Sequence, residues 1–226
     1  MTTESWFERE RHRMVYEQIE RRGIRHPGVL HAMRMVPRHL FVPLELQEAA
    51  YEDSALSIGS GQTISQPYIV ALMTSLLDLH GDETILEVGT GSGYQAAVLS
   101  YLGAAVHTIE RHEQLAQKAA IRLHSLGIHH VFVHQGDGSE GWPEAAPYQA
   151  IMVTAAAPCL PQALADQLDE GGRLILPVGP RRRQELQRWQ RELGHLDYEN
   201  IIPVAFVPLR GKYGWQEEDW KDERGS

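Results

Sequence analysis

The chain has 226 residues, which is long enough for one α/β domain with a sizeable buried core. Its 30 acidic residues outnumber 21 basic ones, and this net charge of −9 argues against a protein that binds a phosphate backbone. The single cysteine excludes an intrachain disulfide and a thiolate metal cluster. The first residues are charged where a signal peptide would be apolar, and no apolar run approaches the ~18 residues of a membrane span. We therefore expect a cytoplasmic monomer without nucleic-acid or membrane partners.

The N-terminal quarter predicts two helices followed by an irregular segment. Residues 4–25 are charged and carry Val15 and Ile19 one turn apart, as on an amphipathic helix. A second short helix should reach Met35 and stop before Pro37. Residues 52–67 contain two glycines and a proline and are interpreted as irregular, and a third helix pattern begins at Pro67.

The middle of the chain alternates between strand and helix patterns. Expected strands are 84–88, 105–110, 128–133, 148–154 and 173–178, and expected helices are 94–102, 113–126 and 161–168, the last stopped by Gly171-Gly172. This spacing predicts βαβ units with a mostly parallel sheet and helices on both faces. Beyond Pro180, residues 185–191 and 201–209 resemble two strands joined by a loop with Gly194, which predicts an antiparallel C-terminal edge.

The absence of repeats and low-complexity linkers predicts one Rossmann-like α/β domain over residues 1–226. Within it we expect a helical extension at 1–50 and a segment covering substrate and cofactor at 51–80. A cofactor-binding core should follow at 81–180, with C-terminal strands and a tail at 181–226.

A glycine turn follows the first expected strand and carries three glycines as Gly89-x-Gly91-x-Gly93. Such a turn lets the backbone approach a ligand, while the following helix offers free N–H groups. The spacing differs from the G-x-G-x-x-G of a dinucleotide fold, and Glu87 would repel a pyrophosphate but suits the amine of S-adenosylmethionine. Glu110 ends the second strand, where a carboxylate can accept both ribose hydroxyls.

Asp137, after the next strand, can accept a hydrogen bond from the adenine amino group, although Asp-Gly is also a common turn. A glycine loop without a ligand is the alternative for the turn, and a helix cap is the alternative for Ser65. His129, His130 and His134 lack partnering cysteines and do not indicate a metal site. Cys159, flanked by prolines, is expected to be a small buried hydrophobic residue.

Several blocks of sequence resemble the protein-L-isoaspartate (D-aspartate) O-methyltransferase family. They are Tyr51-Glu-Asp-Ser54, Gln62-Thr-Ile-Ser-Gln-Pro67, Leu86-Glu-Val-Gly-Thr-Gly-Ser-Gly-Tyr94, Gly136-Asp-Gly138 and Leu168-Asp-Glu-Gly-Gly-Arg-Leu-Ile-Leu-Pro-Val-Gly179. The Thr63–Pro67 block is much more specific than the glycine turn. The resemblance implies a class I S-adenosylmethionine-dependent methyltransferase fold. It also implies methylation of the free α-carboxyl of L-isoaspartyl, and by extension D-aspartyl, residues in damaged proteins and peptides, with S-adenosylhomocysteine as product.

The resemblance also implies residue roles. Ser65 corresponds to the active-site serine, which we interpret as an orienting hydrogen-bond donor because no G-x-S-x-G nucleophile elbow surrounds it. The backbone at 154–155 and 207–208 would line the path of the substrate peptide. The expected cofactor-binding residues are Thr63, Ile64, Ser65, Gln66, Glu87, Gly89, Thr90, Gly91, Ser92, Gly93, Glu110, Arg111, Asp137, Gly138 and Thr154, with no metal ligand.

Two other functions stay open at this point. A methyltransferase that acts on another carboxylate or a small molecule would share the glycine turn, and only the Thr63–Pro67 block argues against it. A non-catalytic cofactor-binding module is disfavoured by the intact Glu87, Glu110, Asp137 and Ser65.

Overall fold

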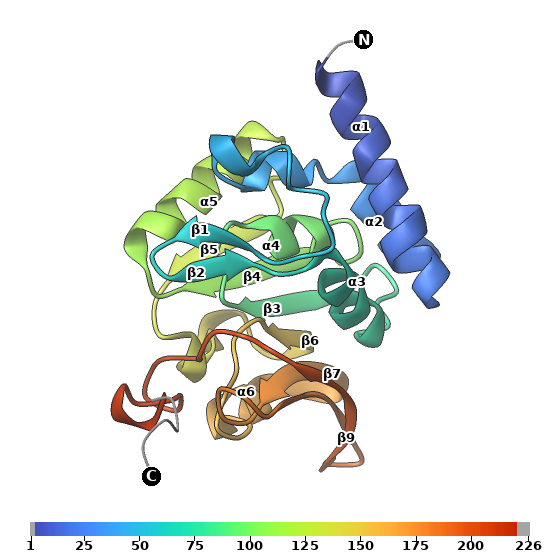
Figure 1. Ribbon diagram of the computed structural model, residues 1–226. Helices are drawn as coiled ribbons and strands as arrows, with labels where there is room; N and C mark the ends of the chain where they lie inside the picture. The colour runs from blue at the N-terminus through green and yellow to red at the C-terminus, as the bar shows by residue number, and fades with distance from the viewer. Residues whose placement is uncertain (1–2, 221–226) are drawn as a thin grey trace.

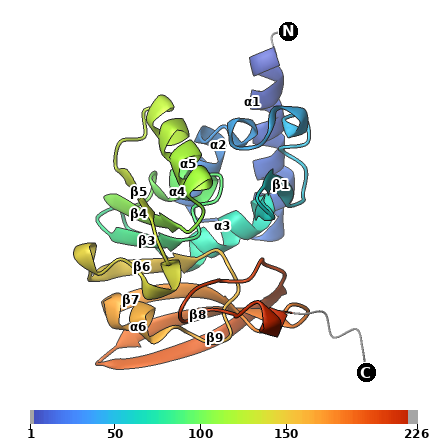
Figure 2. The same ribbon diagram turned by 90° about the vertical axis from the view of Figure 1, so that its left-hand side faces the viewer.

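A seven-stranded sheet forms the centre of the computed structural model, which describes residues 3–220 (Figure 1). Its strands are β3 (Thr84–Val88), β4 (Ala105–Glu110), β5 (Val131–Gln135), β6 (Tyr148–Val153), β7 (Leu168–Val178), β8 (Gln184–Glu192) and β9 (His195–Val204). They lie in the order β5-β4-β3-β6-β7-β8-β9, which can be followed down Figure 2. Pairs from β5 to β7 are parallel, and β7–β8 and β8–β9 are antiparallel. The predicted parallel sheet with an antiparallel C-terminal edge is confirmed.

The N-terminal helices pack on one side of this sheet (Figure 2). Helix α1 (Thr3–Met14) continues through a π-helical turn at Val15–Ile19 and a 3-10 turn at Glu20–Arg22, and α2 (Pro27–Met35) follows. Gly23 ends the first run with φ of +96°, a conformation that glycine adopts readily. Val15 and Ile19 are fully buried, so the apolar side of the predicted amphipathic helix faces the core.

Successive residues of the central strands point to opposite faces, so the core has two layers. Ile85, Met152 and Ile175 pack with α2, α3 (Pro67–Leu76) and α4 (Tyr94–Leu99). Leu86, Ile151 and Leu174 face the other way, toward α6 (Gln162–Gln167) and the segment around Leu209. Helix α5 (Glu113–Ser125) covers β4 and β5. The central strands are buried on both faces, which explains why their sequences are mostly apolar and do not alternate between polar and apolar residues.

The structure corrects four details. Residues 52–67 are not all irregular, because β1 (Leu56–Gly59) and β2 (Gln62–Ile64) form an antiparallel hairpin. Gly171 and Gly172 lie inside β7 and do not precede it. The last strand covers 195–204 and not 201–209, since the tight turn at Leu193-Gly194 lets pairing with β8 begin at His195. Cys159 is exposed and not buried. Between residues 3 and 220, no helix is both long and apolar enough to cross a bilayer.

Candidate active site

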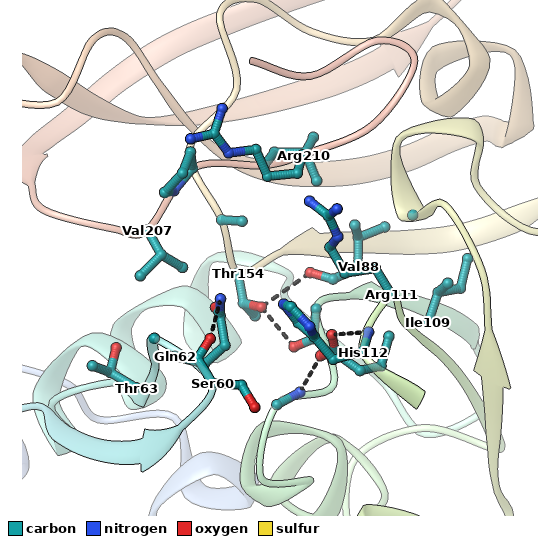
Figure 3. A pocket seen from close by; sticks show the side chains of 18 of the residues that line it. Ser60, Gln62, Thr63, Val88, Ile109, Arg111, His112, Thr154, Val207 and Arg210 are labelled. Carbon is teal, nitrogen blue, oxygen red and sulfur yellow. Dashed lines mark hydrogen bonds between the residues drawn. The ribbon is translucent and has the colours of Figure 1, made fainter. Parts of the chain in front are cut away.

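The site lies at the carboxyl ends of β3, β4 and β6. Chain order reverses at β3, because β4 and β5 lie on one side of it and β6 and β7 on the other. Where the chain order reverses in this way, the loops after neighbouring strands leave the sheet in opposite directions, and a crevice opens between them. A cavity of about 430 Å³ occupies this position (Figure 3). The β1–β2 hairpin, the glycine turn, the ends of β4 and β6, and the segment 207–210 contribute to its walls.

The glycine turn forms the floor of this cavity. Gly89, Gly91 and Gly93 have φ of +100°, +53° and +87°, values that side chains with a Cβ rarely adopt. At Gly89 a Cβ would also collide with Thr154 Oγ1. That hydroxyl lies against the turn because it donates to the carbonyls of Val88 (3.0 Å) and Gly89 (2.7 Å). The turn is therefore shaped by three glycines and held by one threonine from the end of β6.

Glu110 lies in the cavity wall at the end of β4. Its Oε2 accepts from the Gly91 N–H at 2.9 Å, and its Oε1 accepts from the His112 N–H at 2.9 Å. Both oxygens keep further lone pairs, so the carboxylate can still accept hydroxyl donors from a ligand. Arg111 and His112, which are labelled in Figure 3, follow Glu110 in the chain and line the same cavity.

Glu87 lies beneath the turn and does not line the cavity. Its side chain is fully buried in β3, where Oε2 accepts from Thr108 Oγ1 at 2.5 Å, and Thr108 in turn contacts Thr90 Oγ1 at 2.7 Å. Burial raises the pKa of Glu87 to about 8; the Thr108 hydrogen bond opposes this rise, and the negative charge of Glu110 adds to it. The structure thus places Glu87 behind the turn, in indirect contact with it through Thr108 and Thr90.

Asp137 and Gly138 take different positions at the end of β5. Gly138 lines the cavity, where a Cβ would approach the Val88 side chain. The Asp137 carboxylate is half-buried and faces other groups: Oδ1 accepts from the Ser139 N–H (2.9 Å) and hydroxyl (2.7 Å). Oδ2 accepts from the Lys212 N–H at 2.7 Å. The expected contact of this carboxylate with adenine stays a prediction.

The Thr63–Gln66 segment separates the first cavity from a second one of about 520 Å³. Thr63 lines both cavities, whereas Ser65 and Gln66 line the second but not the first; Ser65 also lines a small third cavity beside the glycine turn. Ile64 is buried in the core, and Thr90 and Ser92 line this third cavity below Thr63. The second cavity is closed on its far side by Pro203 to Val207.

Arg38 holds this segment from the protein side. Its guanidinium is fully buried and donates to the carbonyls of Ala50 (2.7 Å) and Ser65 (2.8 Å). Burial lowers the pKa of Arg38 to about 10, so the group stays cationic at neutral pH. Nothing in the sequence pattern distinguishes this arginine from a surface residue. It was missed because both of its partners are backbone carbonyls, 12 and 27 residues away.

Sequence analysis also missed cavity residues from the hairpin and from the C-terminal segment. Ser60, Gly61 and Gln62 reach the first cavity because the hairpin folds over the turn, where Ile58 lies next to Gly91. A Gly-Ser-Gly step between alternating apolar residues was the available hairpin signal. Arg210, Glu217 and Trp220 line the same cavity and carry no such local signal.

The histidines of the β5 region have separate partners. His134 Nε2 lies 3.0 Å from His107 Nδ1, His130 Nε2 lies 2.7 Å from the Ser100 carbonyl, and His129 packs edge-on against His124. Over residues 3–220, no group of three or more histidine, cysteine or acidic side chains is arranged to hold a metal ion.

Comparisons with known proteins agree with this architecture. The model of the protein-L-isoaspartate(D-aspartate) O-methyltransferase family matches residues 9–214. A protein-L-isoaspartate O-methyltransferase from Pelotomaculum thermopropionicum is 53% identical over 210 residues, covering 92% of each chain. One from Methanoculleus marisnigri is 52% identical over 210 residues, covering 93% of this chain and 96% of its own.

Two solved structures share the fold over most of the chain. A protein-L-isoaspartate O-methyltransferase superposes with a TM-score of 0.82 at 30% identity, covering 90% of this chain and 67% of its own. A putative enzyme of this name from Plasmodium falciparum, in complex with S-adenosyl-L-homocysteine, has a TM-score of 0.78 at 25% identity, covering 88% of this chain and 98% of its own. The expected class I methyltransferase fold is confirmed, and the chain belongs to the protein-L-isoaspartate(D-aspartate) O-methyltransferase family.

Proposed function

We propose that this protein transfers a methyl group from S-adenosylmethionine to the free α-carboxyl of isoaspartyl residues in proteins and peptides. The observation that carries the proposal is the arrangement of two cavities that meet at Thr63, Thr154 and Val207. The first cavity adjoins the glycine turn and Glu110, and the second contains Ser65. A cofactor in the first and a peptide in the second would place donor and acceptor on either side of that junction.

The residues of the first cavity suit an adenosyl cofactor. The turn brings backbone close to a ligand, and Glu110 offers a carboxylate already oriented by two backbone N–H donors. The solved Plasmodium structure in complex with S-adenosyl-L-homocysteine supports an S-adenosyl cofactor for this chain. Glu87 would act on the cofactor amine only through the buried Thr108–Thr90 chain and through its electrostatic field.

The chemistry requires positioning rather than proton transfer. A peptide α-carboxyl has a pKa of roughly 3.3–3.7 and is ionised at neutral pH, so no general base is needed. Its oxygen forms a bond to the methyl carbon as the sulfur–methyl bond breaks, and the electron pair of that bond stays on sulfur. A carboxylate and a sulfonium become neutral together, so a site that excludes water and aligns the two supports the reaction.

Ser65 fits the role of a hydroxyl donor that orients the acceptor carboxylate. Desolvating a carboxylate is unfavourable unless donors replace water, and a hydrogen bond to a charged oxygen is stronger than a neutral one. The backbone nitrogen of the following residue can then attack the ester carbonyl and close a succinimide as methanol leaves, and hydrolysis of this ring returns part of the product to normal aspartate. Activity on D-aspartyl residues, a cytoplasmic location, a monomeric state and the absence of nucleic-acid and membrane partners remain proposals.

A pair of peptides that differ only in isoaspartate versus aspartate tests the function. With labelled S-adenosylmethionine, the isoaspartyl peptide should gain a base-labile methyl ester while the aspartyl peptide should not. A small-molecule carboxylate serves as a third acceptor and separates isoaspartyl repair from a methyltransferase of another specificity. Equal labelling of both peptides, or labelling of neither, would contradict the proposal.

A further inference from the structure

The C-terminal segment 210–220 folds back onto the first cavity (Figure 1). Arg210, Glu217 and Trp220 contribute to the cavity wall, as do the hairpin residues Ser60 and Gln62. Figure 3 shows Arg210 and Val207 on the side of the cavity away from the β4 end. Glu217 and Trp220 lie beyond residue 214, where the match to the family model ends. These two wall residues therefore lie outside the part of the chain that the family model matches.

Hydrogen bonds fasten this segment to the loop after β5. The Lys212 N–H donates to Asp137 Oδ2 at 2.7 Å, and the Tyr213 N–H donates to Ser139 Oγ at 3.0 Å. Lys212 Nζ also contacts Glu140 at 2.9 Å. The approach is close enough that a Cβ on Gly211 would collide with the Asp137 carboxylate. The backbone of the segment, more than its side chains, is thus recognised by the end of β5.

The far part of the segment is braced against its own start. The Trp215 N–H donates to the Leu209 carbonyl at 2.8 Å, and Arg210 donates to the Trp215 carbonyl at 3.1 Å. The Trp215 and Trp220 rings pack with their centroids 5.4 Å apart. This ring packing links Trp220, which lies at the cavity wall, to the part of the segment that follows the hydrogen-bonded residues 211–213. Residue 211, which contacts Asp137, and Trp220, which lines the cavity, are thus parts of one braced segment.

We propose that Trp220 is a cofactor-contacting residue that closes the adenine end of the first cavity, and that Asp137 positions it by holding the backbone of residues 211–212. Glu110 locates the ribose end, so the adenine would lie farther along, between the ends of β4 and β5, where the segment is fastened. An aromatic ring is a suitable wall for a purine, because flat rings stack favourably on the face of any nucleobase. This inference rests on the proposed use of S-adenosylmethionine.

Calorimetric titration with S-adenosylhomocysteine tests the proposal without depending on turnover. Trp220→Ala should weaken binding about tenfold, as expected for the loss of one base-stacking ring. Trp220→Phe, which keeps an aromatic face, should recover most of that affinity. Glu218→Ala changes an exposed neighbour outside the cavity wall and should bind like the wild type.

Gly211→Ala tests the positioning role of Asp137 through the same titration. Its Cβ should push residues 211–212 away from Asp137 and weaken binding by a factor similar to that of Trp220→Ala. Gly127→Ala is the control, because Gly127 also has positive φ (+73°) but has open space where its Cβ would lie. Wild-type affinity in Trp220→Ala or Gly211→Ala would overturn the inference, as would an equal loss in Glu218→Ala or Gly127→Ala. The proposed function is tested separately: it stands if the wild type binds S-adenosylhomocysteine and methylates the isoaspartyl peptide, whatever the affinities of these variants are.

Discussion

Gly89→Ala tests the fit between the glycine turn and the end of β6. Two penalties add at this position. An L-residue at φ of +100° costs about 1–2 kcal/mol. Overpacking against Thr154 Oγ1, which is tied to two carbonyls, costs about 1–3 kcal/mol more. We expect a loss of about 2–5 kcal/mol in the free energy of unfolding, with weaker cofactor binding because the turn must shift.

Denaturant unfolding of Gly89→Ala and of Gly81→Ala separates the two penalties. Gly81 has φ of +113°, and no atom lies within 4 Å of the point that its Cβ would occupy, so its substitution should show the conformational penalty alone. In a Thr154→Ala background the hydroxyl is gone, and Gly89→Ala should cost no more than Gly81→Ala does in the wild type. The reasoning is refuted if Gly89→Ala is as mild as Gly81→Ala, or if Thr154→Ala leaves its cost unchanged.

Three further predictions concern single side chains. Ser65→Ala should lower kcat/KM on the isoaspartyl peptide by roughly 10- to 100-fold, because one hydrogen bond to a charged group is lost. The Kd of the cofactor should stay within about twofold of the wild-type value. A collapse of cofactor binding would contradict the role of Ser65 in the second cavity. Glu110→Gln should weaken cofactor binding about tenfold, because the NH2 group of the glutamine would face the Gly91 or the His112 N–H, which is also a donor. Titration calorimetry measures the affinity, and an unchanged value would remove Glu110 from the cofactor site. The pKa of Glu87 rises from 4.5 unfolded to about 8 folded, so its contribution to stability is present below pH 4.5 and is lost as pH rises to about 8. Glu87→Gln should therefore flatten the pH dependence of Tm across that window, and an unchanged profile would refute the raised pKa.

Much of the parallel core could be predicted because its signals are local. The strand from Ala105 to Glu110 was predicted with the bounds that the structure has, since a stretch rich in β-branched residues ends at a charged residue just before a helix. The glycine turn was equally clear, because three positive φ angles within five residues leave little choice but glycine. Glu110 follows from the same logic, since the end of a strand next to the turn must face the crevice.

The sequence does not predict surroundings that contacts between distant residues decide. Glu87 and Glu110 are both acids near strand ends, yet one is buried beneath the turn and the other lines the cavity. The neighbouring Thr108 contributes to that difference, and its contact with Glu87 depends on which strand pairs with β3. Asp137 shows the same limit: its partner Lys212 is 75 residues away, and no local pattern predicts that the chain will return.

The α/β class, the nucleoside turn and, through the Thr63–Pro67 block, the family resemblance that implies the acceptor can all be inferred from the amino-acid sequence. These properties depend on residues close together in the chain, whose backbone angles and spacing restrict the possible structures. The folded chain was needed to show that Thr63 lies between two cavities, that Arg38 donates to the Ser65 carbonyl, and that Trp220 lines the first cavity. Those placements result from packing between distant segments, where the favourable contacts appear only after the sheet has formed.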